Sequence, residues 1–161
     1  MPEGEKKSDG LDAHEAADLM SCPLCMRVSL TKAGKYPYLI HEFKNSYLML
    51  GEHQFFKGYC VLVSKDHYRE MTDVPSPVRE EIFSELMLSS KAVEDVFSPK
   101  KMNMCSLGNV VDHVHWHLFP RYQEDPHFYD PPWLRMKEFE SAKVTPEEAR
   151  ATISKIVTRF S

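Results

Sequence analysis

The sequence lacks several features that would assign it to large classes of protein. Lys and Arg number 20 against 24 for Asp and Glu, so the net charge is -4 with histidine neutral. Long nucleic acids are held by many Lys and Arg contacts to phosphate, so this charge excludes them as partners. No apolar run approaches the ~20 residues of a membrane span, and no membrane segment is expected. A small anionic ligand in a local pocket remains compatible with this composition.

The sequence also argues against a disulfide-rich protein, a secreted protein and a P-loop protein. Four cysteines in 161 residues do not make a disulfide scaffold. The first residues also lack the apolar core of a signal peptide, so we expect a reducing, cytoplasmic location. No Walker-type glycine loop is present, which argues against a P-loop phosphate site. The length fits one domain with its own core.

The order of segments predicts an α+β fold. We expect residues 1–18 to form a flexible N-terminal lead. Residues 19–161 should form a single domain that ends in an irregular arm and a helix. Runs of strands interrupted by one long helix are typical of an antiparallel sheet. About five strands are expected, at residues 39–40, 47–50, 59–63, 102–107 and 113–119, with Pro120 stopping the last.

Helix signals define the long helix and the C-terminal one. Ser76 is the expected N-cap of the long helix, with Pro77 at its first position, and Ser98-Pro99 ends it. Thr145 to Glu148 is a capping box that begins the last helix. The buried face of the long helix is expected to carry Ile82, Phe83, Leu86, Ser90, Val93 and Phe97.

Three histidines alternate along the last predicted strand. Because strand side chains alternate, His113, His115 and His117 share one face, while the apolar residues between them share the other. The three rings would span roughly 13 Å, the reach of a polyphosphate with one ring per phosphate. Neutral imidazole is a competent nucleophile near pH 7, and a protonated neighbour can act as the acid. The alternatives are a metal-binding histidine row and chance.

The stretch from Asp112 to Arg121 resembles the histidine-triad signature, His-φ-His-φ-His-φ-φ, where φ is apolar. Gly108-Asn109 before it and Pro120-Arg121 after it are similar to the same family. The wider likeness runs from about Cys22 to Trp133 and is closest to the diadenosine tetraphosphate hydrolase branch. The resemblance implies a HIT-like fold and a hydrolase that cleaves at the α-phosphate of a nucleoside polyphosphate or phosphoramidate, most of all a dinucleoside polyphosphate.

The resemblance also implies roles for individual residues. His115 would form a covalent nucleotidyl-imidazole, and His117 would protonate the leaving oxygen and later help to activate water. Substrate-binding positions would be Gly108, Asn109, His113 and Trp133. One departure is Tyr59, which stands where many members of the family have a fourth histidine.

The resemblance also bears on assembly and on competing functions. It implies a homodimer that pairs through the long helix and a strand, and Met87 and Leu88 lie beyond the helix's core face as a second apolar contact. A transferase branch carries glutamine at the position of His117, and glutamine cannot titrate, so hydrolysis is favoured over transfer. A non-catalytic nucleotide-binding or interaction protein is the other alternative, although such a module need not retain both His115 and His117.

Cys22 and Cys25 have the two-residue gap that lets both thiolates bind one metal ion. No second such pair exists, and the alternative is two free thiols on a loose turn. Some histidine-triad members have a similar pair, with zinc completed by residues that match His67 and His113. Four protein ligands would make a closed, structural zinc site.

Four other residues have plainer expected roles. Trp133 either stacks on a nucleobase or covers the edge of the domain. Arg121 is expected to be solvated or ion-paired, and Glu85 to lie on a solvated helix face. His53 has no spacing partner, so we expect it at the surface.

Overall fold

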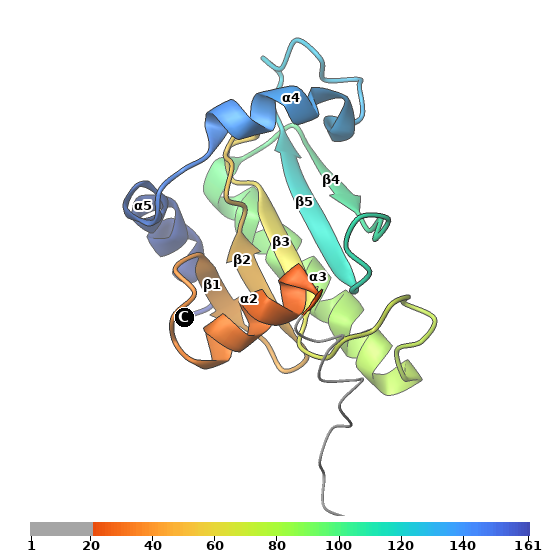
Figure 1. Cartoon of the computed structure of the whole chain (residues 1–161). Coiled ribbons are helices and arrows are strands. Elements are labelled where there is room, and N and C mark those ends of the chain that lie inside the picture. The colour runs from red at the N-terminus through yellow and green to blue at the C-terminus, as the bar shows by residue number, and fades with distance from the viewer. Residues whose placement is uncertain (1–20) are drawn as a thin grey trace, which may run out of the picture.

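The computed structural model describes residues 21–161, and its centre is a five-stranded antiparallel sheet (Figure 1). All neighbouring strands pair antiparallel, which confirms the predicted α+β class. The predicted lead at residues 1–18 lies outside the described residues. In spatial order the strands are β1 (Leu39–Glu42), β2 (Ser46–Leu50), β3 (Cys60–Ser64), β5 (His115–Arg121) and β4 (Lys101–Cys105).

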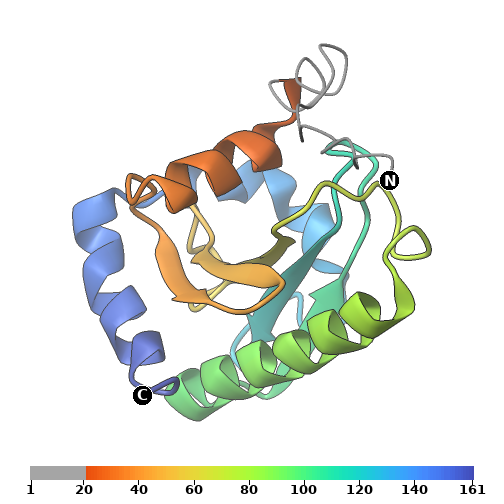
Figure 2. The same cartoon turned by 90° about the horizontal axis from the view of Figure 1, so that it is seen from below.

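Helices cover both faces of the sheet (Figure 2). One face packs against α3 (Ser76–Phe97) and α5 (Pro146–Val157), and the other against α2 (Pro23–Lys32) and α4 (Met136–Phe139). The 3₁₀ turns Pro132–Arg135 and Glu140–Ala142 flank α4. None of the helices in this part of the chain is long and apolar enough to cross a bilayer.

Strand alternation sorts the side chains of β5 between these two layers. Trp116 and Leu118 pack with the core beneath α3, and Phe119 packs with the core beneath α2. By the same period of two, His115 and His117 project towards the α2 side. Because β5 lies between β3 and β4, the paired histidines sit in the interior of the sheet rather than at its edge.

The long helix α3 ends as predicted but begins differently. Ser98 follows it in the left-handed conformation, with φ of 47°, which closes the helix. The prediction of Ser76 as N-cap is wrong, because the helix already includes Ser76 and its cap is Pro75, which makes no side-chain bond. Phe83 is 42% exposed, so its assignment to the buried face is also wrong. It lies one position beyond the buried stripe, and its ring centroid is 5.7 Å from that of Trp116.

The prediction that Glu85 lies on a solvated helix face is wrong. Its carboxylate is buried and accepts hydrogen bonds from the Asn45 backbone N–H, at 3.0 Å, and from the Ser46 hydroxyl. A buried carboxylate needs such donors, because burial without them is costly. These bonds tie α3 to the turn between β1 and β2.

Pro120 does not stop β5, which continues to Arg121. β3 pairs with β5 only as far as Cys60–Leu118, whereas β4 continues to pair with β5 up to Arg121. Beyond Leu118 the strand has a neighbour on one side, and a residue without an N–H is tolerated at such an edge.

The N-terminal helix α2 was not predicted from the sequence. Cys22 caps it through a 3.5 Å bond from the Cys25 backbone N–H to its sulfur, and Pro23 occupies the first turn. Proline in the first turn is a helix-start signal that was available in Cys22-Pro23. The C-terminal helix α5 was predicted correctly, and its capping box at Thr145 and Glu148 is present.

Candidate active site and metal cluster

His115 and His117 form a close pair on β5. Their Nε2 atoms lie 3.1 Å apart, and their ring centroids lie 4.8 Å apart with the planes nearly perpendicular. The Nδ1 atom of His115 lies 2.6 Å from the carbonyl oxygen of His113. Because a carbonyl only accepts, Nδ1 of His115 carries the proton and its Nε2 carries a lone pair.

The expected row of three rings is not formed, because the third histidine lies apart from the pair. His113 precedes β5, and its ring turns away from the pair. Its Nε2 lies 2.9 Å from the Ser64 carbonyl oxygen, and its Nδ1 faces the sulfurs of Cys22 and Cys25. Both ring nitrogens therefore face protein atoms, which favours a metal role for His113 over contact with a substrate.

Burial governs the protonation of the pair. It lowers the pKa of His115, and burial together with the neighbouring His115 lowers the pKa of His117 to about 3. Both rings are therefore neutral near pH 7 in the free protein. A neutral His115 keeps its lone pair available for attack on an electrophile.

Tyr59 completes the environment of His117. Its hydroxyl oxygen lies 2.6 Å from Nδ1 of His117. Its ring is stacked on Phe119, with centroids 4.4 Å apart, and on His53, at 4.6 Å. Gly51 lies directly against the same ring: a Cβ atom there would be 2.0 Å from Cδ1 of Tyr59. The residue that departs from the family pattern is thus held by its surroundings in contact with the pair.

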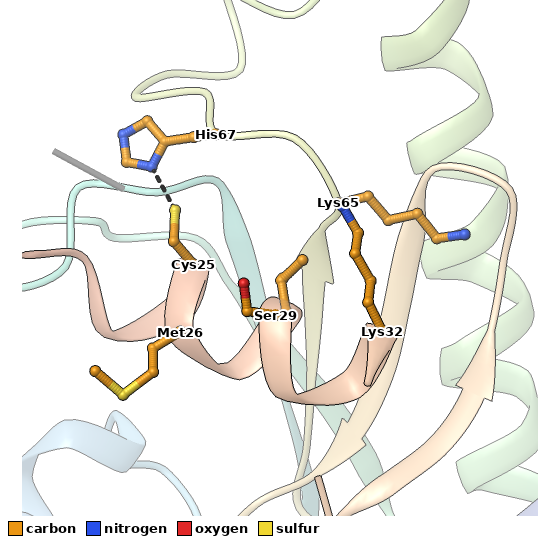
Figure 3. A pocket seen from close by; sticks show the side chains of 7 residues that line it. Cys25, Met26, Ser29, Lys32, Lys65 and His67 are labelled. Atoms are coloured by element: carbon orange, nitrogen blue, oxygen red, sulfur yellow. Dashed lines mark hydrogen bonds between the residues drawn. The ribbon is translucent and has the colours of Figure 1, made fainter. Parts of the chain in front are cut away.

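Cys22, Cys25, His67 and His113 form a cluster at the end of β5 nearest His113. One ligand atom from each lies within 4.8 Å of the others. Figure 3 shows the Cys25 sulfur directed at the His67 ring, and the sulfur lies 3.1 Å from Nδ1. Nδ1 of His113 lies 3.6 Å from the Cys22 sulfur and 3.4 Å from that of Cys25.

The two distances from His113 to the sulfurs match those between ligands of a tetrahedral metal ion, and the Cys25–His67 distance is shorter. Thiolate and imidazole ligands at zinc distances lie roughly 3.4–3.8 Å from one another. The Ser64 carbonyl fixes the proton of His113 on Nε2, which leaves Nδ1 free as a ligand, as an outer hydrogen bond does in metal sites. Burial and the neighbouring Cys22 raise the pKa of Cys25 to about 12, so its thiolate form needs a nearby cation. The cluster can therefore hold a metal ion.

A hollow of about 380 Å³ opens beside this cluster, between α2 and the segment after β3 (Figure 3). Lys32 and Lys65 are among its lining residues, but His115 and His117 are not. Lys65 is already paired with Glu42, at 2.6 Å, and lies over the ring of Tyr47. The hollow therefore flanks the metal cluster and is separate from the histidine pair.

Comparison with known proteins adds a family to this geometry. The model of the HIT domain matches residues 34–124, more than half of the chain. The chain belongs to the HIT family. No curated protein matches it.

Solved structures of HIT proteins share the fold. A histidine triad protein from Bradyrhizobium japonicum is 19% identical, with 76% of this chain and 90% of that chain covered and a TM-score of 0.65. A histidine triad nucleotide-binding protein from Sulfolobus tokodaii, described as hypothetical, is 16% identical, with coverage of 84% and 91% and a TM-score of 0.66. A Zn-bound histidine triad family protein from Mycobacterium smegmatis is 22% identical, with coverage of 87% and 98% and a TM-score of 0.59.

Most of the arm that follows β5 lies outside the HIT match and is organised by Arg121. The expectation of an ion pair is correct, since Arg121 bonds to Asp125 at 2.9 and 2.6 Å, but the guanidinium is buried rather than solvated. Its other bonds go to the Asn103 side chain and to the carbonyls of Asp130 and His127. These bonds use all five N–H groups of the guanidinium, so Arg121 is committed to the arm and has no donor left for phosphate.

The arm places Trp133 against the histidine pair. The indole is perpendicular to the His117 ring, with centroids 4.7 Å apart, and also packs edge-on against Phe119. Trp133 therefore lies beside His117, over an interior strand of the sheet, a placement that differs from the predicted cover over the edge of the domain. Stacking on a nucleobase stays a prediction.

Gly108 and Asn109 lie in the loop between β4 and β5. Gly108 has φ of 71°, a left-handed conformation that favours glycine, and Asn109 is exposed. Ser106, which the sequence did not single out, donates its hydroxyl to the His115 carbonyl at 2.8 Å. This bond fixes the loop to the backbone of the histidine strand.

His53 corrects the expectation of a surface histidine. Its ring lies between Tyr59 and Phe139, at centroid distances of 4.6 and 4.1 Å, and its Nδ1 is buried. Burial lowers its pKa to about 4. A nearby ion pair between Arg27 and Glu52, 2.8 Å apart, was also not predicted. Neither feature has a spacing signal, because the partners come from separate parts of the chain.

Proposed function

We propose that the chain is a nucleotide hydrolase that cleaves at the α-phosphate of a nucleoside polyphosphate or phosphoramidate, with a dinucleoside polyphosphate as the preferred substrate. The observation that carries the proposal is the His115–His117 pair. The His113 carbonyl directs the proton of His115 to Nδ1, so Nε2 keeps the lone pair that attack requires. His117 lies 3.1 Å from that atom, within reach of the same reacting group.

The reaction proceeds in two displacements. Nε2 of His115 attacks the α-phosphorus, and the bond from phosphorus to the leaving oxygen or nitrogen breaks as His117 gives that atom a proton from Nε2. In the second step a water molecule attacks phosphorus and loses a proton to His117. The P–N bond then breaks and its electron pair returns to His115, which releases the nucleoside monophosphate.

His117 needs a proton before the first step. In the free protein it is neutral, because burial lowers its pKa. The negative charge of a bound polyphosphate favours the imidazolium form, since a nearby opposite charge raises the pKa of a histidine. Backbone N–H groups near Gly108 and the amide of Asn109 are the proposed donors to the phosphate oxygens.

Two alternative functions remain as competitors. A nucleotidyl transferase is disfavoured because His117 can titrate, whereas the glutamine of transferase relatives cannot. A non-catalytic nucleotide-binding module is disfavoured because the pair keeps both the Nε2 lone pair of His115 and the adjacent ring of His117.

We also propose that the cluster of Cys22, Cys25, His67 and His113 binds one structural zinc ion. Four protein ligands leave no open position for water or phosphate. Support comes from the cluster's separations and from the similar HIT protein of M. smegmatis, which is described as Zn-bound. The bound ion would hold α2 against the segment that leads into β5.

We also propose that the chain forms a homodimer in the cytoplasm. β4 is an edge strand of the sheet, and apolar side chains are exposed on it and on α3. An exposed apolar patch over an unpaired strand edge is typical of an interface between identical chains. The exposed residues are Phe83, Met87, Leu88 and Met104. A monomer mass by light scattering at micromolar concentration would contradict this.

The hydrolase is tested with His115→Asn and a panel of dinucleoside polyphosphates and adenosine phosphoramidate. The amide keeps the volume and polarity but cannot form a P–N intermediate, so hydrolysis should be abolished while nucleotide binding survives. Turnover within tenfold of the wild type would remove His115 from the nucleophile role. His117→Ala should lose most activity on poor leaving groups, because those most need protonation. Equal losses on good and poor leaving groups would argue against the acid role.

A further inference from the structure

The hydrogen bonds of the histidine pair continue to Tyr59, and their direction can be derived from one end. The His113 carbonyl accepts from Nδ1 of His115, which leaves a lone pair on Nε2 of His115. Nε2 of His117 lies 3.1 Å away, and two lone pairs cannot face each other at that distance. Nε2 of His117 therefore carries a proton and donates it to His115.

The neutral His117 ring then has its lone pair on Nδ1. The Tyr59 oxygen lies 2.6 Å from this atom, so the Tyr59 hydroxyl is the donor. Burial keeps it in the donor form, because it raises the pKa of Tyr59 well above the ordinary range. The order of donors is thus Tyr59 to His117, His117 to His115, and His115 to the His113 carbonyl.

We propose that Tyr59 is a positioning residue that fixes His117 in the tautomer with its proton on Nε2, directed at the reacting centre. The proposal rests on the proposed function for its effect on rate, but the tautomer itself does not depend on any substrate.

A hydroxyl group suits this position because it can reverse its role. When His117 becomes cationic, Nδ1 gains a proton and must donate it. The Tyr59 oxygen can then accept, after its O–H bond rotates. One residue therefore holds the His117 ring in both protonation states.

The packing around Tyr59 fixes its hydroxyl in this position. Gly51 and His53 contact its ring, and Phe119 stacks on it almost in parallel, with 6° between the planes. A phenylalanine at this position keeps these contacts and removes the hydroxyl alone. Tyr59→Phe is therefore a clean substitution, and Tyr59→His restores a donor of the family's kind.

The test compares wild type, Tyr59→Phe and Tyr59→His by ¹⁵N NMR of the histidine rings in the full chain. In the wild type we expect His117 to carry its proton on Nε2, with Nδ1 unprotonated. In Tyr59→Phe the form protonated on Nδ1 should increase, and Tyr59→His should restore the wild-type pattern. A wild-type His117 protonated on Nδ1, or a tautomer unchanged in Tyr59→Phe, overturns the proposal.

Kinetics supply the second readout. Loss of one hydrogen bond of ~1 kcal/mol should lower kcat for poor leaving groups by roughly three- to tenfold in Tyr59→Phe, with KM unchanged. Tyr122→Phe is the matched control, because the Tyr122 hydroxyl donates to the Lys57 carbonyl at the surface. It should change neither the tautomer nor kcat. If the wild type hydrolyses no nucleotide, the proposed function fails, and NMR still decides the role of Tyr59.

Discussion

The two ends of β5 are anchored in contrasting ways. Before the strand, His113 joins Cys22, Cys25 and His67 in a cluster whose members come from three distant parts of the chain. At the other end, the buried guanidinium of Arg121, the last residue of the strand, bonds to groups that lie mostly within ten residues of it. Both anchors reach segments beyond the HIT match at residues 34–124, namely α2 and most of the arm.

With the proposed zinc ion bound, the first anchor depends on an ion, whereas the chain itself supplies the second. The cluster gathers two thiols and two imidazoles, and holding them together as ligands requires a cation. Arg121 carries its own charge and finds Asp125 four residues away. A chelator can therefore remove the first anchor and leave the second in place.

Removal of the metal anchor should have the largest effect. Cys22→Ser with Cys25→Ser should abolish the expected one zinc per chain and lower stability by at least about 4 kcal/mol, the value for a ligand present at a thousand times its Kd. For a chain of this size this is a fall in Tm of roughly 8–16 °C. Zinc content and thermal unfolding measure it.

Hydrolysis by the folded fraction of this variant should fall only modestly, through looser placement of His113. Cys60→Ser is the control, since Cys60 is buried on the α3 side, away from the cluster. It should keep its zinc. A zinc-free wild type of full stability would contradict the site, and metal removal that abolishes activity at unchanged stability would make the metal catalytic.

Breaking the second anchor should cost slightly less. Arg121→Met leaves Asp125 and two carbonyls without their donor, and loss of one partner of a buried ion pair costs about 3 kcal/mol. Zinc should stay bound, while the fluorescence of Trp133, measured in a Trp116→Phe background, should shift as the arm loosens.

The matched control is Arg69→Met, which breaks the exposed ion pair between Arg69 and Asp112. Such a pair contributes less than about 1 kcal/mol. Adding Asp125→Leu to Arg121→Met should recover part of the lost stability, because the uncompensated carboxylate is removed as well. An Arg121→Met protein as stable as the Arg69→Met protein would contradict the anchor.

Acid should lower the stability of the protein through His53, which packs on Phe139 beyond the arm. Its pKa of about 4 lies below the 6.5 of the unfolded chain, so the unfolded state binds more protons between these values. Stability is therefore full above pH 6.5 and falls as the pH drops towards 4, by about 2 kcal/mol at pH 5. Melting of wild type and His53→Phe at pH 5 and 8 measures this.

His53→Phe keeps the stacking and removes the titration, so its Tm should fall less on acidification than that of the wild type. Release of zinc from the cluster in acid acts equally on both proteins and cancels in the comparison. An identical acid response in the two proteins would remove His53 as the cause.

The smallest expected loss of stability comes from a substitution far from both anchors, and it is the reference for the larger losses. Thr145→Ala removes the N-cap of α5, which is remote from both anchors, and should cost about 1 kcal/mol. Neither zinc content nor Trp133 fluorescence should change. A change in either would mean that stability loss anywhere disturbs the two ends of β5, and the contrast between them would be lost.

Local signals predicted most of the fold. Strand alternation, the stop at Ser98-Pro99 and the capping box at Thr145 each depend on neighbours in the sequence, and the structure bears them out. Apart from the N-cap of α3 and the missed helix α2, which are local errors, the errors arise where a distant partner decides. Glu85 is buried because Asn45 and Ser46 supply donors across the fold.

The same division applies to the site. Alternation predicts that His115 and His117 share a face, and the structure places them together. The turn of His113 away from them depends on Ser64 and the cysteines, which no spacing within the triad encodes. The five bonds of Arg121 depend on a loop conformation, and two of its acceptors are backbone carbonyls that are the same in every residue.

The contact between Gly51 and Tyr59 has a consequence for how this sequence can change over generations. A Cβ at position 51 would lie 2.0 Å from the Tyr59 ring, so alanine is accessible there only after the residue at position 59 has become smaller. The order of the two substitutions therefore matters: Gly51→Ala first displaces the ring that contacts His117, whereas a small side chain without a ring at position 59 first opens the space. Relatives with a side chain at position 51 should thus descend from ancestors that had already given up the tyrosine.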